Sequence, residues 1–213
     1  RTIKIERVAR EAGYRTKVAV SSIDLKVDCV GACVGMRGSR IKNIVEVLGG
    51  ERIDIVRWNE SLQVMVPNAL QPAAIEEIML YPRLGRAIVL VKEDQLSLAI
   101  GRRGQNVRLA SKLVGWDIEI MTAEELAESI ERAEGWFRML PGVTDELIEG
   151  FIGEGFLSYD DLTFLEPVEM AELFGIDEET AQTIITVAEA AAEAVEAAKE
   201  RARYRSSDNE ESA

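Results

Sequence analysis

Apolar and polar residues alternate along the first 58 residues in a pattern that predicts strands around a helical segment. Thr2–Ala9 and Thr16–Val20 combine this alternation with β-forming residues on either side of an Ala-Gly-Tyr turn, which predicts two strands. A short apolar run follows at Val30–Val34, and apolar residues then recur at helical spacing from Ile41 to a Gly-Gly stop. Arg52–Trp58 alternates again and predicts a third strand.

The same order of elements returns in the next 63 residues. Ala74–Leu80 and Ala87–Val91 are rich in β-forming residues and are separated by a proline, although the first is also compatible with a helix. Apolar residues at Leu96–Ile100 predict a helix, and Val107–Val114 predicts a second one that ends at a glycine. Trp116–Met121 predicts the closing strand.

Aligning the two copies at an offset of 66 residues places two Gly-x-x-Gly loops on each other, Gly35–Gly38 and Gly101–Gly104. A single loop of this kind is a weak signal, because glycine is common. Here each loop lies between an apolar helix and an amphipathic helix that leads into a strand. Such internal self-similarity is the mark of a repeated structural module.

A Gly-x-x-Gly loop before a helix suits the backbone of single-stranded nucleic acid. Glycines let the main chain approach the sugar-phosphate closely, and the amides and positive dipole end of the following helix favour phosphate. Arginines nearby can pair with phosphate and stack on bases. We therefore interpret the copies as two KH modules in tandem that bind RNA. The candidate RNA-binding residues are Gly35, Met36, Arg37, Gly38, Arg40, Lys42, Gly101, Arg102, Arg103, Gly104, Asn106 and Arg108.

The net charge of −13 is divided unevenly along the chain. Residues 1–121 carry a net charge of +5, whereas residues 122–213 carry −18. The first part can neutralise phosphate and the second would repel it. The two parts are therefore expected to have different partners.

Several classes of site are disfavoured by the residue types present. The chain has no histidine and two cysteines, Cys29 and Cys33, so a four-ligand zinc site and the usual histidine-dependent hydrolase designs are not expected. We interpret both cysteines as small buried residues in a reducing, cytoplasmic compartment. No apolar run is long enough for a membrane helix. We expect a soluble monomer that is not an enzyme, with no cofactor, metal or membrane partner.

From Thr122 onwards the pattern becomes acidic and helical. Apolar-glycine turns at Leu140–Val143 and Leu173–Ile176 each precede an acidic helix start, which resembles helix-hairpin-helix elements. Acidic side chains beside both turns argue against DNA binding by this part. We expect a small helical domain over residues 123–203 and a disordered tail over 204–213.

Long stretches of the first part resemble the NusA family of bacterial transcription factors, namely Ile5–Gly13, Val30–Ile41, Gly49–Val56 and Ala99–Ser111. The resemblance implies an α+β chain with two type II KH domains, at residues 1–62 and 63–122, packed as a rigid pair. It also implies binding of nascent RNA in pausing, termination and antitermination. Family members carry a polymerase-binding domain and an S1 domain ahead of the KH pair, so we expect this chain to be a piece of a larger protein.

The acidic part resembles the acidic C-terminal repeats of some family members more loosely. That resemblance implies RNA polymerase as a partner of the full-length protein, contacted through the C-terminal domain of the polymerase α-subunit. A helical bundle with no function beyond its own core is an equal alternative. Two further alternatives are an RNA-processing enzyme that uses the KH pair to hold substrate, and an acidic module that regulates the KH pair.

Overall fold

The computed structural model describes residues 2–210, with side chains for residues 2–203. Its contacts divide the chain into two units, residues 1–123 and 124–213. This division lies one residue from the point where the sequence becomes acidic and helical. The domain boundary expected from the sequence, at 122/123, remains a prediction that differs from this division by one residue.

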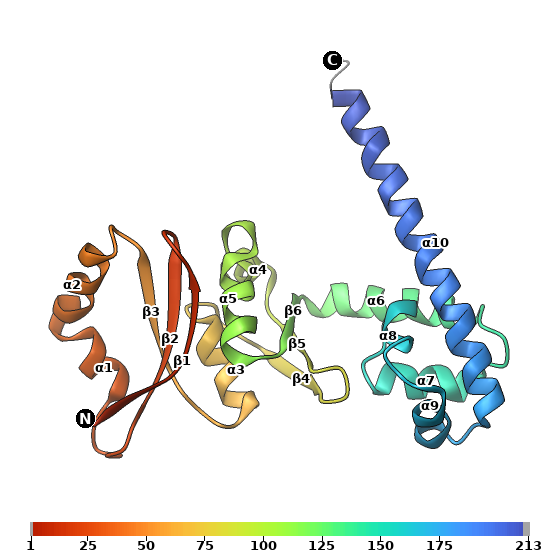
Figure 1. Cartoon of the computed structure of the whole chain (residues 1–213), viewed down its shortest axis with the longest axis horizontal. Helices are drawn as coiled ribbons and strands as arrows, with labels where there is room; N and C mark the ends of the chain where they lie inside the picture. The colour runs from red at the N-terminus through yellow and green to blue at the C-terminus, as the bar shows by residue number, and fades with distance from the viewer. Residues whose placement is uncertain (1, 211–213) are drawn as a thin grey trace. The chain divides into compact units, whose positions relative to one another are not determined.

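The first unit repeats one order of elements (Figure 1). The first copy consists of β1 (Ile3–Glu11), β2 (Arg15–Ser22), α1 (Cys29–Val34), α2 (Ser39–Val47) and β3 (Arg52–Arg57). The second copy consists of α3 (Leu62–Leu70), β4 (Glu77–Tyr81), β5 (Arg86–Leu90), α4 (Glu93–Ile100), α5 (Gln105–Val114) and β6 (Asp117–Met121). We call residues 1–61 the first module and residues 62–122, from the start of α3, the second.

Each module builds a three-stranded sheet with the same topology. The first two strands pair antiparallel as a hairpin, and the third returns after two helices to lie parallel to the second. The parallel register begins at Arg15↔Arg52 in the first sheet and at Arg86↔Asp117 in the second. The repeat that the sequence predicts is therefore present in the backbone.

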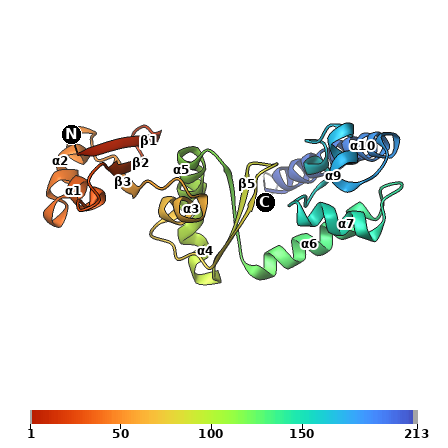
Figure 2. The same ribbon diagram turned by 90° about the horizontal axis from the view of Figure 1, so that it is seen from below.

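Helix α3 is an element that the sequence pattern did not reveal. Its segment contains Pro67 inside the helix, a residue that usually ends helices, together with β-branched valines. The helix forms because tertiary packing outweighs these local preferences. It buries Met65, Val66, Ala69 and Leu70 and packs against α5 (Figure 2).

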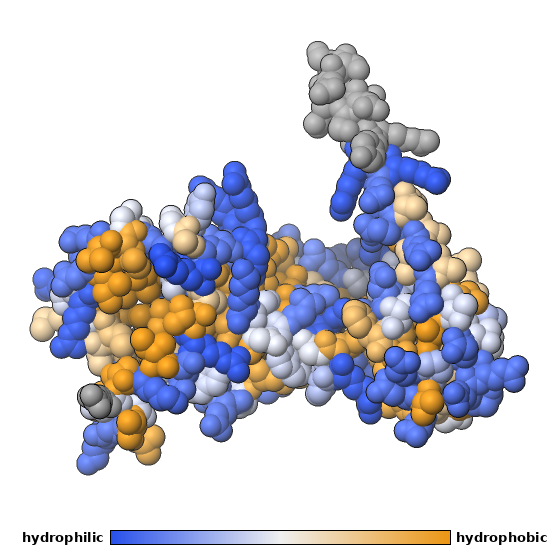
Figure 3. Space-filling view, in the orientation of Figure 1, coloured by the Kyte–Doolittle hydropathy of each residue, from blue (hydrophilic) through white to orange (hydrophobic). Residues whose placement is uncertain are grey.

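The helices that follow the two loops differ in how deeply they are buried. Helix α5 buries five residues, among them Leu109 and Leu113, whereas α2 buries none. Leu113 is 0% exposed, and Val47, at the matching position of the first copy, is 85% exposed. No described element covers α2 as α3 covers α5, and the surface over α2 is visibly apolar (Figure 3).

The two modules share one hydrophobic core. Ala9, Ala19 and Val56 of the first sheet belong to the same buried cluster as Leu109 and Leu113 of α5. Arg7 adds a polar contact across the modules, because its Nη1 donates a 2.8 Å hydrogen bond to the Val114 carbonyl. The pair therefore folds as one body, as the resemblance implied.

The second unit is helical. It consists of α6 (Ala123–Phe137), α7 (Asp145–Gly153), α8 (Tyr159–Leu162), α9 (Pro167–Phe174) and α10 (Glu178–Glu210). Phe137, Phe151 and Phe174 form edge-to-face contacts in its core. Helix α10 extends to Glu210, so part of the tail expected to be disordered is helical in the structure, where an Ala/Glu-rich segment with high helix propensity leads into it. Residues 211–213 lie outside the described part.

Within residues 2–210, no helix is both long enough and apolar enough to span a membrane. The same described residues contain no group of three or more acidic, cysteine or histidine side chains that could hold a metal ion.

The different burial of α2 and α5 gives a matched test of the shared core. Leu113→Ala should lower the free energy of unfolding by about 2–5 kcal/mol, because it leaves a cavity between the modules. Val47→Ala, at the equivalent exposed position, should change it by less than about 0.5 kcal/mol. Urea denaturation followed by circular dichroism measures both. Equal effects of the two substitutions would contradict the shared core.

Candidate nucleic-acid interface

The two Gly-x-x-Gly loops have nearly the same backbone conformation. The first glycines have positive φ and extended ψ, and the third and fourth residues are left-handed. The φ/ψ pairs are 74°/171° for Gly35 and 78°/167° for Gly101, 53°/28° for Arg37 and 54°/29° for Arg103, and 77°/17° for Gly38 and 70°/14° for Gly104. Two segments 66 residues apart thus fold into one loop type.

The first glycine of each loop is required by close packing as well as by its φ. A Cβ on Gly101 would lie 2.8 Å from both the backbone nitrogen and the Cβ of Asn106. A Cβ on Gly35 would lie 2.8 Å from Cγ and 3.0 Å from the backbone nitrogen of Arg40. The start of each following helix therefore packs tightly against its loop. Any side chain at these glycines would push the loop away from the helix start.

Arg37 and Arg103 are the two non-glycine residues with positive φ in the part of the chain that the structure describes. A left-handed conformation in such a residue costs about 1–3 kcal/mol and tends to occur at functional sites. Both occupy the third position of their loops, and both side chains are exposed. The strained backbone presents an arginine to solvent at equivalent points of the two modules.

The amides at the start of α2 and α5 lie directly behind these loops. Each helix begins one residue after the second glycine, and in the described structure no side chain caps its N-terminus. The first amide of each helix donates to a loop carbonyl, Ser39 to Met36 and Gln105 to Arg102. The positive end of the helix dipole and the remaining amides of the first turn favour a phosphate at this position. Arg37 and Lys42 in the first loop region, and Arg102 and Arg103 in the second, are exposed beside it. Met36 is 84% exposed at the tip of the first loop.

Three of the candidate side chains make hydrogen bonds within the protein. Nη1 of Arg40 donates a 2.5 Å hydrogen bond to the Ala32 carbonyl. Asn106 is 1% exposed, and its Nδ2 donates to the carbonyls of Leu70 and Ala99 at 3.1 and 2.9 Å. These contacts link each loop region to the preceding helix, Arg40 at the surface and Asn106 in the interior.

Arg108 is the third, and its guanidinium links the two modules. Nε and Nη2 donate to the carboxylate of Glu11 at 2.5 and 3.1 Å, and Nη1 donates to the Arg103 carbonyl at 2.9 Å. Gln105 adds a 3.0 Å hydrogen bond to the same carboxylate. The hydrogen bonds from Arg108 and then Gln105 lower the pKa of Glu11 to about 2. Glu11, which the sequence pattern did not single out, fixes the second loop against the first module.

Glu51 organises the turn between β1 and β2. Its carboxylate accepts two 2.9 Å hydrogen bonds from Arg10, one from the Thr16 hydroxyl and one of 2.9 Å from the Gly13 amide. These contacts, led by the one with Arg10, lower the pKa of Glu51 to about 2. Glu51 is 1% exposed, and the turn is tied to the start of β3 through it.

The two cysteines lie on α1, the helix that leads into the first loop. Both are free thiols on α1, with Cys29 buried and Cys33 half-buried rather than buried as expected. Burial raises the pKa of the Cys33 thiol.

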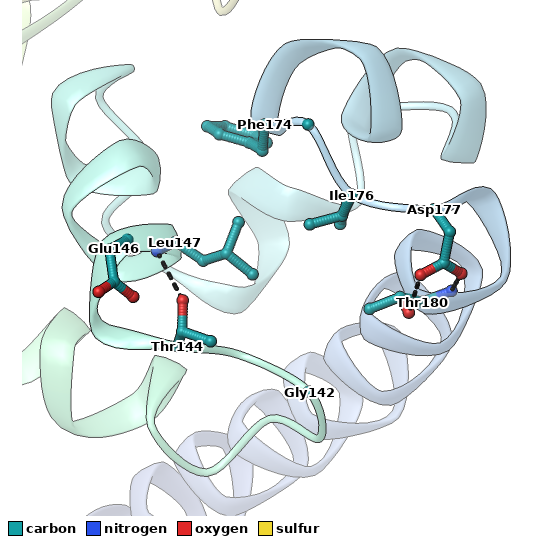
Figure 4. Close-up of a pocket in the computed structure, with 9 residues that line it drawn as sticks. Gly142, Thr144, Glu146, Leu147, Phe174, Ile176, Asp177 and Thr180 are labelled. Atoms are coloured by element: carbon teal, nitrogen blue, oxygen red, sulfur yellow. Dashed lines mark hydrogen bonds between the residues drawn. The ribbon is translucent and has the colours of Figure 1, made fainter.

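A hollow of about 510 Å³ lies in the acidic unit between its two hairpins (Figure 4). Thr144 caps α7 by accepting a 3.3 Å hydrogen bond from the Leu147 amide. Asp177 caps α10 by accepting hydrogen bonds of 2.8 and 2.7 Å from the amide and hydroxyl of Thr180, and these bonds, led by the hydroxyl, lower its pKa. Glu146 also lines the hollow. Ionised carboxylates at both hairpins would repel a phosphate backbone.

Comparison with known proteins identifies both modules. Residues 1–58 match the NusA-like first KH domain, and residues 62–128 match the NusA-like second KH domain. The chain is 40% identical to the transcription termination/antitermination protein NusA of Rickettsia conorii over 191 residues, which cover 85% of this chain and 38% of that protein. It is 38% identical to the protein of the same name from Borreliella burgdorferi over 175 residues, covering 80% and 36%.

The chain thus spans less than two fifths of the length of these curated relatives. The similarity to the first relative covers 85% of the chain, more than the first 123 residues alone provide, so it extends into the acidic unit. The crystal structure of APE1850 aligns with 56% of this chain and 88% of its own at 30% identity, with a TM-score of 0.44.

The hydrogen bonds of Glu51 predict how stability depends on pH. Its pKa in the folded state, about 2, lies below the ordinary value of 4.5, so its stabilising effect is complete above about pH 5 and is lost as the pH falls towards 2. Glu51→Gln should therefore destabilise the protein clearly at pH 7 and much less at pH 3. Chemical denaturation at both pH values measures this, with the exposed Glu60→Gln as control. A Glu51→Gln effect of the same size at both pH values would contradict this role.

Proposed function

The chain belongs to the NusA-like family through its two KH domains, and we propose that it binds single-stranded RNA with both Gly-x-x-Gly loops at once. The observation that carries this proposal is the repeated loop conformation. In both modules, an exposed arginine in a left-handed conformation lies beside an uncapped helix N-terminus. Each KH module of this kind holds about four nucleotides by their backbone.

The loops supply complementary parts of the recognition. The backbone amides at the starts of α2 and α5 bind phosphate oxygens, and the exposed guanidinium groups neutralise neighbouring phosphates. Arg40, Asn106 and Arg108 keep the loops in this conformation through their contacts with carbonyls and with Glu11. Because the modules share a core, RNA meets two loops whose spacing is fixed.

In the full-length protein, this binding serves nascent RNA during transcription in the cytoplasm. The two relatives above are named as termination/antitermination proteins, and their similarity supports a role in pausing, termination and antitermination beside RNA polymerase. We propose no catalytic step for the chain. Nuclease or NTPase activity of the purified chain would favour the alternative of an RNA-processing enzyme.

The second loop provides the most direct test of RNA binding. Arg102→Asp combined with Arg103→Asp should lower affinity for single-stranded RNA at least tenfold, because two exposed cations become anions beside the phosphate site. The slope of log affinity against log salt concentration should fall by about 0.7 for each phosphate that the variant no longer neutralises. Fluorescence anisotropy of a labelled RNA over several salt concentrations measures both.

The control for this test reverses two exposed lysines. Lys26 and Lys92 lie near the opposite end of the helix that precedes each loop, so Lys26→Asp with Lys92→Asp makes the same change in net charge away from the loops. If the control loses as much affinity as the loop variant, binding depends on net charge alone. If the loop variant keeps its affinity, the site is elsewhere.

We also propose that the acidic unit docks a basic protein surface, with the C-terminal domain of the polymerase α-subunit as the partner. Its two hairpins meet at a hollow with carboxylates on both sides (Figure 4). An adjoining hollow is lined by Pro141, Gly142, Asp177, Glu179, Thr180 and Thr183, of which Gly142, Asp177 and Thr180 line both hollows. Opposite charges at such a rim chiefly speed association and select the partner.

This docking can be tested by reversing one carboxylate of the rim. Glu179→Lys should weaken binding of that polymerase domain several-fold, whereas Glu193→Lys, an exposed change further along α10, should have little effect. Isothermal titration calorimetry measures both. Equal affinities of the two variants would count against docking at the hairpins. If removal of residues 124–213 raises RNA affinity, the acidic unit instead masks the KH pair.

A further inference from the structure

A hollow of about 390 Å³ lies between the β1–β2 turn of the first module and the second Gly-x-x-Gly loop. Both sides belong to the same unit of the structure. Its lining residues are Glu11, Tyr14, Arg102, Arg103, Gln105 and Arg108. The first module therefore contributes side chains to the loop region of the second.

The charges in this hollow favour an anion. Glu11 is the one carboxylate among its lining residues, and it is paired with Arg108 and hydrogen-bonded by Gln105. Two further cations, Arg102 and Arg103, have exposed side chains at the same hollow. The lining thus has a net positive charge, and the only group that would repel phosphate is already neutralised.

Tyr14 adds an aromatic face to this positively charged site. Its side chain is 73% exposed, but its backbone is fixed, because its amide donates to the Glu11 carbonyl at 3.0 Å and its carbonyl accepts from the Arg52 amide at 3.2 Å. The neighbouring Gly13 amide is held by Glu51 at 2.9 Å. A tyrosine on such a fixed turn has only two side-chain torsions to order, so it can stack on a partner at little entropic cost.

We propose that this hollow binds one nucleotide of single-stranded RNA, with its base stacked on Tyr14 and its phosphate held by Arg102 and Arg103. The inference rests on the proposed RNA-binding function and adds a contact from outside both Gly-x-x-Gly loops. Bases stack on aromatic side chains without regard to sequence, and guanidinium groups pair with phosphate. Both modules then contact the nucleotide at the second loop. This shared contact requires the ion pair between Glu11 and Arg108, which holds the second loop against the first module.

The test uses the full chain and a 12-nucleotide single-stranded RNA that carries 2-aminopurine at each position in turn. Fluorescence of this base falls when it stacks, so one position should be quenched on binding through Tyr14. Tyr14→Leu should abolish that quenching and weaken binding by about 5- to 150-fold. Tyr14→Phe should keep the quenching and bind within about twofold of the parent chain, because the stacking ring remains. The salt dependence should not change in either variant, since all the cations that neutralise phosphate remain.

Phe164→Leu is the matched control, because Phe164 is 72% exposed in the acidic unit and should not affect RNA binding. If Tyr14→Leu binds and quenches like the parent chain while Arg102→Asp with Arg103→Asp loses binding, the hollow is not a nucleotide site, although the proposed function stands. If the double arginine variant also binds like the parent chain, the proposed function itself fails. An equal loss of RNA affinity in Tyr14→Leu and Tyr14→Phe would mean that the hydroxyl, and not stacking on the ring, makes the contact. That result would overturn the proposal.

Discussion

Helix α5 packs against α3 of its own module and against the sheet of the first module, so its buried leucines lie in a core that belongs to both. Its first turn carries Arg108, which binds Glu11 at the end of β1. Because α5 begins directly after Gly104, anchoring the helix also fixes the second Gly-x-x-Gly loop relative to the first module. The fixed spacing of the two Gly-x-x-Gly loops follows from this one packing interaction.

The two units differ in how their carboxylates are paired. In the first unit, the carboxylates near the second loop and the β1–β2 turn are engaged by arginines, as in the pairs Glu11–Arg108 and Glu51–Arg10. Among the residues that line the hollow at the second loop, no carboxylate besides Glu11 competes for Arg102 and Arg103. The acidic unit has the opposite arrangement, with exposed carboxylates at its hairpins. The two units of the chain therefore differ in the charge of the ligands that they suit, phosphate for the first and basic groups for the second.

The sequence predicted the repeat, the strands and the loop positions, because these depend on local periodicity and on glycines with positive φ. It did not predict α3, whose proline and valines oppose a helix until α5 covers one of its faces. The sequence also could not predict the ion pair of the Arg108 side chain, since its partner Glu11 lies 97 residues earlier in the chain. The sequence did not single out Tyr14 for the same reason, because the β1–β2 turn meets the second loop only when the two modules pack together.

Ultraviolet crosslinking of the full chain to single-stranded RNA, followed by mass spectrometry of the crosslinked peptides, tests the central claim most directly. Binding by both loops predicts crosslinks in peptides that contain Met36–Arg37 and Arg102–Arg103, with none in residues 124–203. Crosslinks from both loops to one RNA molecule would show that the modules act as a single surface. Crosslinks confined to the acidic unit, or absent from both loops while RNA is bound, would contradict the account.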